Sequence, residues 1–405
     1  MIIVDTALRE RSATAGIQEA LDALPAQGGM VLIPAGTYTL RQSVRLRPNT
    51  RLCGEGPATV LTRPAPVWGR LLEPVIKGQT SVRMENASAL QPGDQLLLRD
   101  FTQGGWHSRY LVVRQVKGGA VEGEIIYGDL ERSYLLENEP WAGTHFPALW
   151  AHQVNDVTIE SLTIDGGPHA YDPARIGDFV CSAVHCRDVM RLRVKDLTIR
   201  RWPSDGVGAQ GGSALVTGCV VEDCLGSGLH PGTCIGQSVW TGNMCRGNWK
   251  GLLFCARVCN TIVANNVFLA NKEHGIWGLG DPDKHNVVSA NVCSDNGWYG
   301  IEGFKAWGNA ITGNVCRGNS QAAPGVYSGI HLEQHRDNLV AGNVCVDDKD
   351  RPTQTRGITA INPIGPNVIG DNHAVEGSAY MSTWVAQEQA HAAFEARKKA
   401  RGGAG

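Results

Sequence analysis

Residues 242–271 read GNMCRGNWKGLLFCARVCNTIVANNVFLAN, and residues 290–319 read ANVCSDNGWYGIEGFKAWGNAITGNVCRGN. Both segments carry an Asn followed by apolar residues, a second Asn five residues later, and a Gly followed by an aliphatic residue. This last pair recurs along the chain at spacings of 22 to 29 residues. Recurrence at spacings of this length is typical of repeat architectures. The positions of the pair are Gly206-Val207, Gly228-Leu229, Gly251-Leu252, Gly275-Ile276, Gly300-Ile301, Gly329-Ile330 and Gly357-Ile358.

Each repeat consists of short β-branched runs interrupted by Gly and Asn, a pattern that predicts two or three strands separated by turns. Equal positions in successive repeats then stack at the spacing of neighbouring strands, about 4.8 Å. The Asn columns become side-chain ladders that bond the turns together. The column of Cys245, Cys293, Cys316 and Cys345 fills the interior. Because the 12 cysteines mostly recur at repeat spacing, we expect reduced, packed thiols and no disulfide framework.

These repeats resemble the right-handed parallel β-helices of the pectin lyase-like superfamily, and the resemblance covers most of residues 1–377. It implies an all-β fold, a single-stranded right-handed parallel β-helix (solenoid). Residues 15–40, AGIQEALDALPAQGGMVLIPAGTYTL, are similar to the beginning of many such proteins, a short helix followed by the first coil. Thr14 is expected to cap this helix. Its apolar face, Ile17, Ala20, Leu21 and Leu24, would cover the strand edges at the end of the coil.

Three segments complete the expected organisation. The β-helix domain spans residues 1–377. Residues of about 74–150 do not follow the repeat and are interpreted as a β-hairpin insertion packed along the coil, which resumes near Asn155. Residues 378–405 are rich in Ala, Glu and Lys and are expected to form a helical or flexible tail.

Composition excludes several classes of protein. The 405 residues are 42% hydrophobic and 19% charged, so an extended polyelectrolyte is excluded. The net charge of −2 leaves no basic field for nucleic acid, and no apolar run is long enough to span a membrane.

The first residues show no secretory leader, which with the reduced thiols slightly favours a cytoplasmic location, whereas the superfamily is mostly extracellular. Location and oligomeric state are left open.

Strand alternation sorts the side chains that face outward. If the aliphatic residue after each Gly points inward, the next residue points outward. This outward column comprises Gly208, His230, Leu253, Trp277, Glu302, His331 and Thr359. A second outward column comprises Gln210, Gly232, Cys255, Leu279, Phe304, Glu333 and Ile361. The turn column, directly before each Gly, comprises Asp205, Ser227, Lys250, His274, Tyr299 and Ser328.

Together the three columns predict an active face. Its candidate catalytic residues are His230, Lys250, His274, Glu302, His331 and Glu333, with Trp277 and Tyr299 as candidate substrate-binding residues. An ordinary solvated polar face is the alternative.

Other polar groups admit two interpretations each. His331, Glu333 and His335 have the residue types of a transition-metal site, although acid–base catalysis by His331 and Glu333 is favoured. Asp281 and Asp283 are able to hold calcium or a sugar hydroxyl, or they form an ordinary turn. Arg257 is a candidate to bind a substrate carboxylate, or it pairs with an acidic residue on a neighbouring coil. Trp106 with His107, and Trp141 with His145, form a wall over a sugar groove or simply pack on the coil.

The resemblance implies a carbohydrate partner, usually an acidic polysaccharide, and β-elimination, C5 epimerisation or glycoside hydrolysis as the reaction. Removal of the C5 proton of a uronic acid needs a base and a cation or hydrogen-bond donor at the carboxylate. Hydrolysis needs two carboxylates, for which Glu302 and Glu333 are the candidates. Because bases outnumber acids on this face, a lyase or C5 epimerase is favoured over a glycoside hydrolase, and a non-catalytic glycan-binding β-helix is the third hypothesis. No cofactor is expected, with a divalent metal such as calcium as the alternative.

Overall fold

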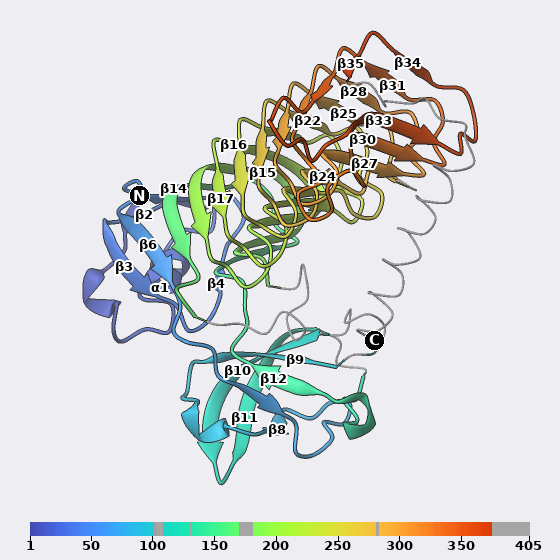
Figure 1. Cartoon of the computed structure of the whole chain (residues 1–405). Coiled ribbons are helices and arrows are strands. Elements are labelled where there is room, and N and C mark those ends of the chain that lie inside the picture. The colour runs from blue at the N-terminus through green and yellow to red at the C-terminus, as the bar shows by residue number, and fades with distance from the viewer. Residues whose placement is uncertain (101, 103–107, 129–131, 170–180, 281–282, 375–405) are drawn as a thin grey trace.

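The computed structural model describes residues 1–100, 102, 108–128, 132–169, 181–280 and 283–374. Figure 1 shows a long coil of parallel strands, with a smaller body attached near the N-terminal part of the coil. All pairings within the coil are parallel, and each strand pairs with its equivalent one coil away. The expected β-solenoid is confirmed.

The coil has three stacks of strands. The first, called the site stack, contains β4 (Val44–Arg45), β13 (Leu149–His152), the first parts of β15 (Val184–Arg200) and β16 (Val207–Thr217), β18 (Leu229–Gly232), β21 (Leu252–Leu253), β24 (Ile276–Trp277), β27 (Ile301–Phe304), β30 (Ser328–Glu333) and β33 (Arg356–Ile361).

The second stack runs from β1 (Ile2–Ile3) through β2 (Gly29–Ile33), β5 (Thr50–Gly54), β14 (Val157–Asp165), later parts of β15 and β16, β19 (Val239–Thr241), β22 (Ile262–Ala264), β25 (Val287–Ser289), β28 (Ala310–Thr312) and β31 (Leu339–Ala341) to β34 (Val368–Gly370). The third contains β3 (Gly36–Thr39), β6 (Thr59–Thr62), the ends of β14 and β15, β17 (Val220–Glu222), β20 (Met244–Arg246), β23 (Val267–Leu269), β26 (Val292–Ser294), β29 (Val315–Arg317), β32 (Val344–Val346) and β35 (His373–Ala374).

Asparagine ladders hold the turns between these stacks. The backbone N–H of Asn243 donates to Oδ1 of Asn266 at 2.9 Å, and Nδ2 of Asn243 donates to the carbonyl of Val216 at 3.1 Å. The same pattern repeats coil after coil, so each buried amide satisfies backbone groups of its neighbours. Both expected ladders are present, and a third one was not predicted. They comprise Asn243, Asn266, Asn291, Asn314, Asn343 and Asn372; Asn248, Asn271, Asn296, Asn319 and Gln354; and Asn286, Asn309, Asn338 and Asn367.

The repeated Gly lies where successive coils approach closely. A Cβ on Gly251 would lie 2.4 Å from the carbonyl oxygen of Gly275, and one on Gly275 would lie 2.6 Å from that of Gly300. A side chain at this position would therefore push the coils apart.

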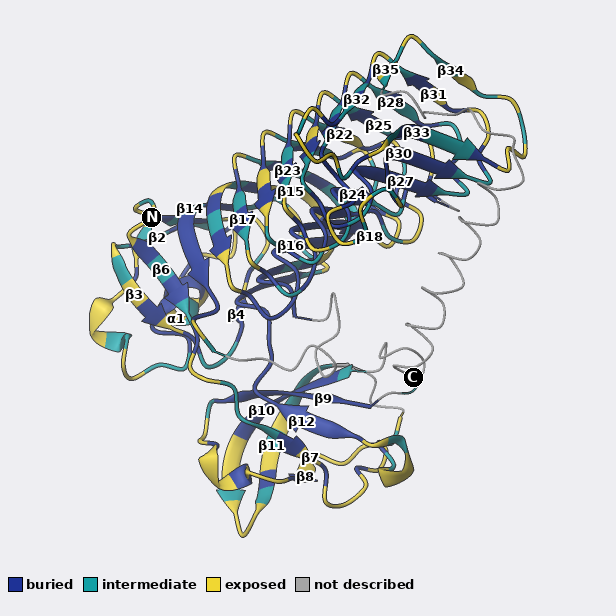
Figure 2. Ribbon diagram, in the orientation of Figure 1, coloured by how far each residue is buried: buried dark blue, intermediate teal, exposed yellow. Residues whose placement is uncertain are grey.

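The interior of the coil is filled by apolar side chains, as expected. Figure 2 shows that much of the coil is buried. Cys245, Cys293, Cys316 and Cys345 are fully buried and free, and Phe268 occupies the same column between the first two. The prediction of stacked, unbonded thiols is confirmed.

The N-terminal helix α1 (Ile17–Asp22) buries Ile17, Ala20 and Leu21 against the first coil. The predicted cap is displaced by two residues, because Gly16 in a left-handed conformation (φ 87°) is the N-cap. Thr14 still contributes, since its hydroxyl accepts from the backbone N–H of Gln18 at 3.4 Å. In the described part of the chain no helix is both long enough and apolar enough to cross a membrane.

The non-repeating segment forms more than the expected hairpin. β7 (Trp68–Arg70), β8 (Ser81–Arg83), β9 (Gln95–Arg99), β10 (Ser108–Lys117), β11 (Ala120–Gly128) and β12 (Trp141–Gly143) build a six-stranded antiparallel sheet. The hairpin is β10 with β11, and the sheet has an apolar cluster of its own. The coil resumes earlier than expected, at β13, because Leu149 pairs with Val44, far back in the sequence. Three short 3-10 helices complete the described elements: Thr6–Leu8, Ala87–Ala89 and Leu136–Asn138. The predicted tail, residues 378–405, lies outside the described residues.

Candidate functional site

The site stack carries the predicted columns in register. Gly208 pairs with His230, Leu253 with Trp277, Glu302 with His331 and His331 with Thr359 on neighbouring coils. Inward aliphatic residues such as Ile301 and Ile330 belong to the apolar core, whereas Glu302 and His331 do not. One member of the second column differs from the prediction. Leu279 is a core residue, because Gly278 adopts a left-handed conformation (φ 93°) that reverses the alternation.

Asp205 and His230 form a buried pair at one end of the site. Oδ2 of Asp205 lies 2.7 Å from Nδ1 of His230, and its Oδ1 accepts from the backbone N–H of Ser227. Burial, the largest single influence, lowers the pKa of His230, but the charge of Asp205 and hydrogen bonds to Asp205 and Cys255 outweigh it and raise the pKa to about 10. At neutral pH this histidine is therefore a fixed cation and not a base.

Lys250 lies one coil further along, in the turn column. Its Nζ is 2.9 Å from Oε2 of Glu273 and sits over the rings of Trp249 and Trp277, at 2.7 and 4.7 Å from their centroids. The side chain is fully buried. A carboxylate and two aromatic faces thus keep an ammonium group in place away from water.

His274 and Glu302 make the next contact. Nε2 of His274 lies 3.3 Å from Oε2 of Glu302. The imidazole stacks on Tyr299 (5.9 Å between centroids, 22° between planes) and on Trp277, and it meets Trp298 edge-on. Glu302 therefore orients a ring that aromatic neighbours already confine.

Tyr299 is enclosed between two histidines. His331 stacks on it at 4.5 Å with only 8° between the ring planes, and His274 stacks on it as well. Nδ1 of His331 lies 2.8 Å from the hydroxyl of Thr359, which in turn lies 2.8 Å from the hydroxyl of Ser328. This network restrains the rotation of the His331 ring.

Although these side chains belong to the predicted outward columns, most of them are buried. His230, Lys250, His274, Tyr299, Glu302 and His331 are each at most 5% exposed. Trp277 and Glu333 are half-buried. Part of the shielding comes from rings that alternation did not place there, namely Trp249, Trp298 and Tyr327.

These missed residues share a sequence position. Trp249, Glu273, Trp298 and Tyr327 each stand one residue before a member of the turn column. A column rich in aromatic residues directly before Lys250, His274, Tyr299 and Ser328 was the signal available. Asp205 and Thr359 were in the predicted columns, but only the geometry shows that each holds a histidine.

The remaining candidates do not join the cluster. Arg257 is exposed in a turn, with φ 72°. His335 is buried beyond the end of β30, where burial lowers its pKa, and it does not continue the alternation of His331 and Glu333.

Trp141 and His145 pack on each other in the interior, with 5.8 Å between their ring centroids, and form no wall over a groove. Asp281, Trp106 and His107 lie outside the described residues. Within the described ranges, no three His, Cys, Asp or Glu side chains are grouped to hold a metal ion.

Comparisons with known proteins agree with this architecture. Residues 182–348 match the family described as a right handed beta helix region. The A-module of the Azotobacter vinelandii mannuronan C-5 epimerase AlgE4 superposes with a TM-score of 0.50 at 16% identity, covering 90% of this chain and 92% of that one. The enzymatically active domain of bacteriophage CBA120 tailspike protein 2 superposes with a TM-score of 0.52 at 9% identity. The superposition covers 88% of this chain and 45% of that one. A search of the curated proteins gave no significant match. At these identities the likeness concerns the fold, and it establishes that the chain is a right-handed parallel β-helix protein.

Proposed function

We propose that this protein is a carbohydrate-active enzyme that removes the C5 proton from a uronic acid residue of a polysaccharide, as a lyase or a C5 epimerase. The observation that carries the proposal is the enclosure of Tyr299 between His274 and His331, with Lys250 on the neighbouring coil. Three groups able to exchange protons thus lie together, and the Lys250 side chain lies one coil from His274. One protein of the same fold is named a mannuronan C-5 epimerase, so polymannuronate is the first substrate to test.

The chemistry assigns a role to each group. A base, His331 or Tyr299, takes the proton from C5, and the electron pair moves into the carboxylate of the sugar. Lys250 neutralises the charge that develops there. Protonation of C5 from the opposite face gives the epimer, whereas expulsion of the oxygen on C4 gives an unsaturated residue. His274, oriented by Glu302, lies on the other side of Tyr299 and is the candidate second proton carrier.

Glycoside hydrolysis is less well supported by the contacts. It requires two carboxylates that act on the sugar. Of the predicted pair, Glu302 and Glu333, Glu302 is engaged with His274. Because the cluster is shielded, a bound sugar chain has to displace groups over it. Trp277 and Trp298, which contact His274, are half-buried.

The test is solvent exchange at C5. During incubation with polymannuronate, polyguluronate or polygalacturonate in D₂O, an epimerase should replace the C5 proton by deuterium, as measured by NMR. A lyase should remove the same proton and leave a C4=C5 double bond with no hydrogen at C5. Absorbance of an unsaturated product then separates the lyase from the epimerase. New reducing ends without deuterium at C5 and without an unsaturated product would indicate hydrolysis. Binding without any product would indicate a glycan-binding protein. Either result contradicts the proposal.

His331→Ala should lower turnover by about 100-fold or more, the usual contribution of general acid–base catalysis. The matched control is His373→Ala, an exposed histidine in β35, which should leave turnover unchanged. Unaltered activity of the His331 variant would remove this residue from the mechanism.

A further inference from the structure

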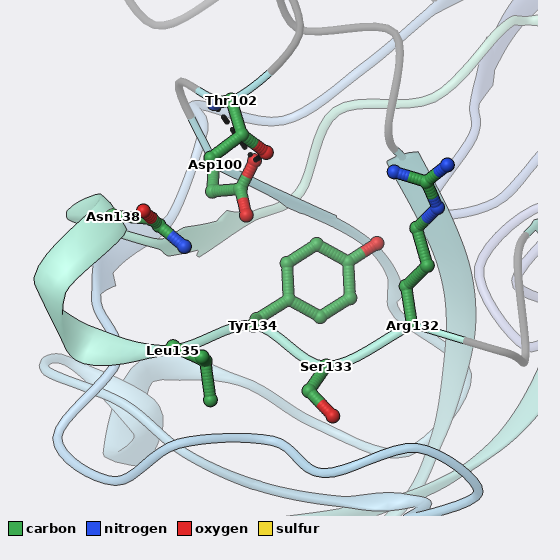
Figure 3. A pocket seen from close by; sticks show the side chains of 7 residues that line it. All are labelled: Asp100, Thr102, Arg132, Ser133, Tyr134, Leu135 and Asn138. Atoms are coloured by element: carbon green, nitrogen blue, oxygen red, sulfur yellow. Dashed lines mark hydrogen bonds between the residues drawn. The ribbon is translucent and has the colours of Figure 1, made fainter.

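The antiparallel insertion contains a pocket of about 310 Å³, far in sequence from the cluster on the site stack. Its lining is Asp100, Thr102, Arg132, Ser133, Tyr134 and Asn138, with Leu135 as the only aliphatic member (Figure 3). In Figure 3 the ring of Tyr134 stands between Asn138 and Arg132, and one oxygen of Asp100 points away from Thr102.

Several contacts give this pocket a fixed framework. Asp100 is 4% exposed, and its Oδ1 accepts from the backbone N–H of Thr102 at 3.0 Å and from the hydroxyl of Thr102 at 2.5 Å. Tyr134 is held by backbone pairing with Val75, and the guanidinium of Arg109 lies 5.4 Å from the centre of its ring. Asn138 ends the 3-10 helix Leu136–Asn138. The polar groups are thus set by the fold of the insertion.

The composition of the lining restricts the ligand. Small-molecule sites of about 300 to 1,000 Å³ are mostly apolar, whereas six of the seven residues here carry polar side chains. One carboxylate and one guanidinium balance each other, so the pocket has no net charge that would select an anion. Carboxylate, amide and hydroxyl groups together offer acceptors and donors for neighbouring hydroxyls. Size and chemistry match a single sugar ring with neutral hydroxyls.

We infer that this pocket is a second carbohydrate site, which holds one neutral pyranose unit. The choice of a sugar as ligand rests in part on the proposed function. In such a protein an additional binding site keeps a polysaccharide attached and raises its effective concentration at the first site. Asp100 and Asn138 are the groups assigned to the ring hydroxyls.

Calorimetric titration of the full chain tests this inference, with methyl α-mannopyranoside, methyl β-glucopyranoside and methyl β-galactopyranoside as neutral probes and glucuronic acid as the charged probe. We expect saturable binding of at least one neutral pyranoside. Asp100→Asn and Asn138→Ala should each weaken that binding by about 10-fold, which corresponds to about 1.4 kcal/mol. Glucuronic acid should bind no more tightly than the neutral probe, because Asp100 and Arg132 leave the pocket without a net charge that would select an anion.

Glu122→Gln is the matched control, since Glu122 is an exposed carboxylate of β11 in the same insertion. It should bind like the unaltered protein. Repeating the titration with His331→Ala separates this inference from the proposed function. Retained binding in that variant supports the pocket whether or not any polymer is turned over. Absence of saturable binding by all neutral probes, or equal affinity in the Asp100, Asn138 and control variants, would overturn it.

Discussion

At the scale of single residues, the site stack is defined by pairs in which a charged or hydroxyl group fixes a base. Asp205 holds His230, Glu302 holds His274, and Thr359 holds His331. Each partner comes from a neighbouring coil, so no pair is visible as a local motif. Asp205 keeps His230 as a cation at neutral pH. This imidazole can therefore serve binding but not proton abstraction.

The His230–Asp205 pair predicts a pH dependence of stability. The pKa of His230 is about 10 in the folded chain and near 6.5 when unfolded. The folded state therefore holds one more proton between these values, and the stabilisation from the pair, full below pH 6.5, is lost as the pH rises through 10. Urea unfolding of the unaltered protein and of His230→Gln at several pH values should show a stability difference that shrinks from pH 6.5 to 10. Parallel profiles over this window would contradict the assignment.

At the scale of elements, the ladders are what make one coil depend on the next. Oδ1 of Asn314 accepts from the backbone N–H and from Nδ2 of Asn291, both at 3.0 Å, and its Nδ2 donates to the carbonyl of Val288 at 2.9 Å. Loss of this side chain leaves buried groups on a neighbouring coil without partners. Such groups cost about 1–3 kcal/mol each when unsatisfied.

Asn314→Ala should therefore lower the free energy of unfolding by several kcal/mol, on the basis of about 1–3 kcal/mol for each orphaned group. The measurement is urea denaturation followed by circular dichroism. Ser289→Ala, on the outer side of the neighbouring strand β25, serves as the control and should change stability little. A loss no larger than that of the control would show that water replaces the ladder amide.

The same elements show what the sequence can and cannot predict. The Gly and Asn columns allow the register of the coils to be predicted. Close contact between coils leaves no room for a side chain at Gly251, and the ladder in the turns requires an amide at Asn266. The burial of the site was not predictable in this way. It depends on rings such as Trp298 and Tyr327, whose direction follows from the turn and not from strand alternation. The prediction that Leu279 points outward was wrong for a related reason, because Gly278 turns the backbone before it.

At the scale of the whole molecule, the coil is a one-dimensional stack in which each turn contacts only its neighbours. Its two described ends differ. At the first coil, α1 buries Ile17 and Leu21 over the strand edges. In the last described coil, Val368 is 64% exposed, and Asn372, the final member of its ladder, is only half-buried. Unfolding of the coil is therefore expected to begin at the last described coils and to proceed toward the N-terminus.

Chemical labelling of the buried thiols can measure the order in which the coils unfold. Eight of the 12 cysteines are buried and four are exposed or partly exposed, and burial raises the pKa of Cys186, Cys219 and Cys224 to about 12. A thiol reagent at neutral pH should consequently label about four cysteines in the folded protein, because only an accessible thiolate reacts. Cys234→Ser, which removes the fully exposed one, should reduce that number by one. In urea below the midpoint of unfolding, pulse labelling read by mass spectrometry should modify Cys345 before Cys219, because Cys345 lies in β32, in the last described coils. Labelling of both at one rate would mean that the coil opens as a single unit, and labelling of Cys219 first would place the weakest coils next to the insertion.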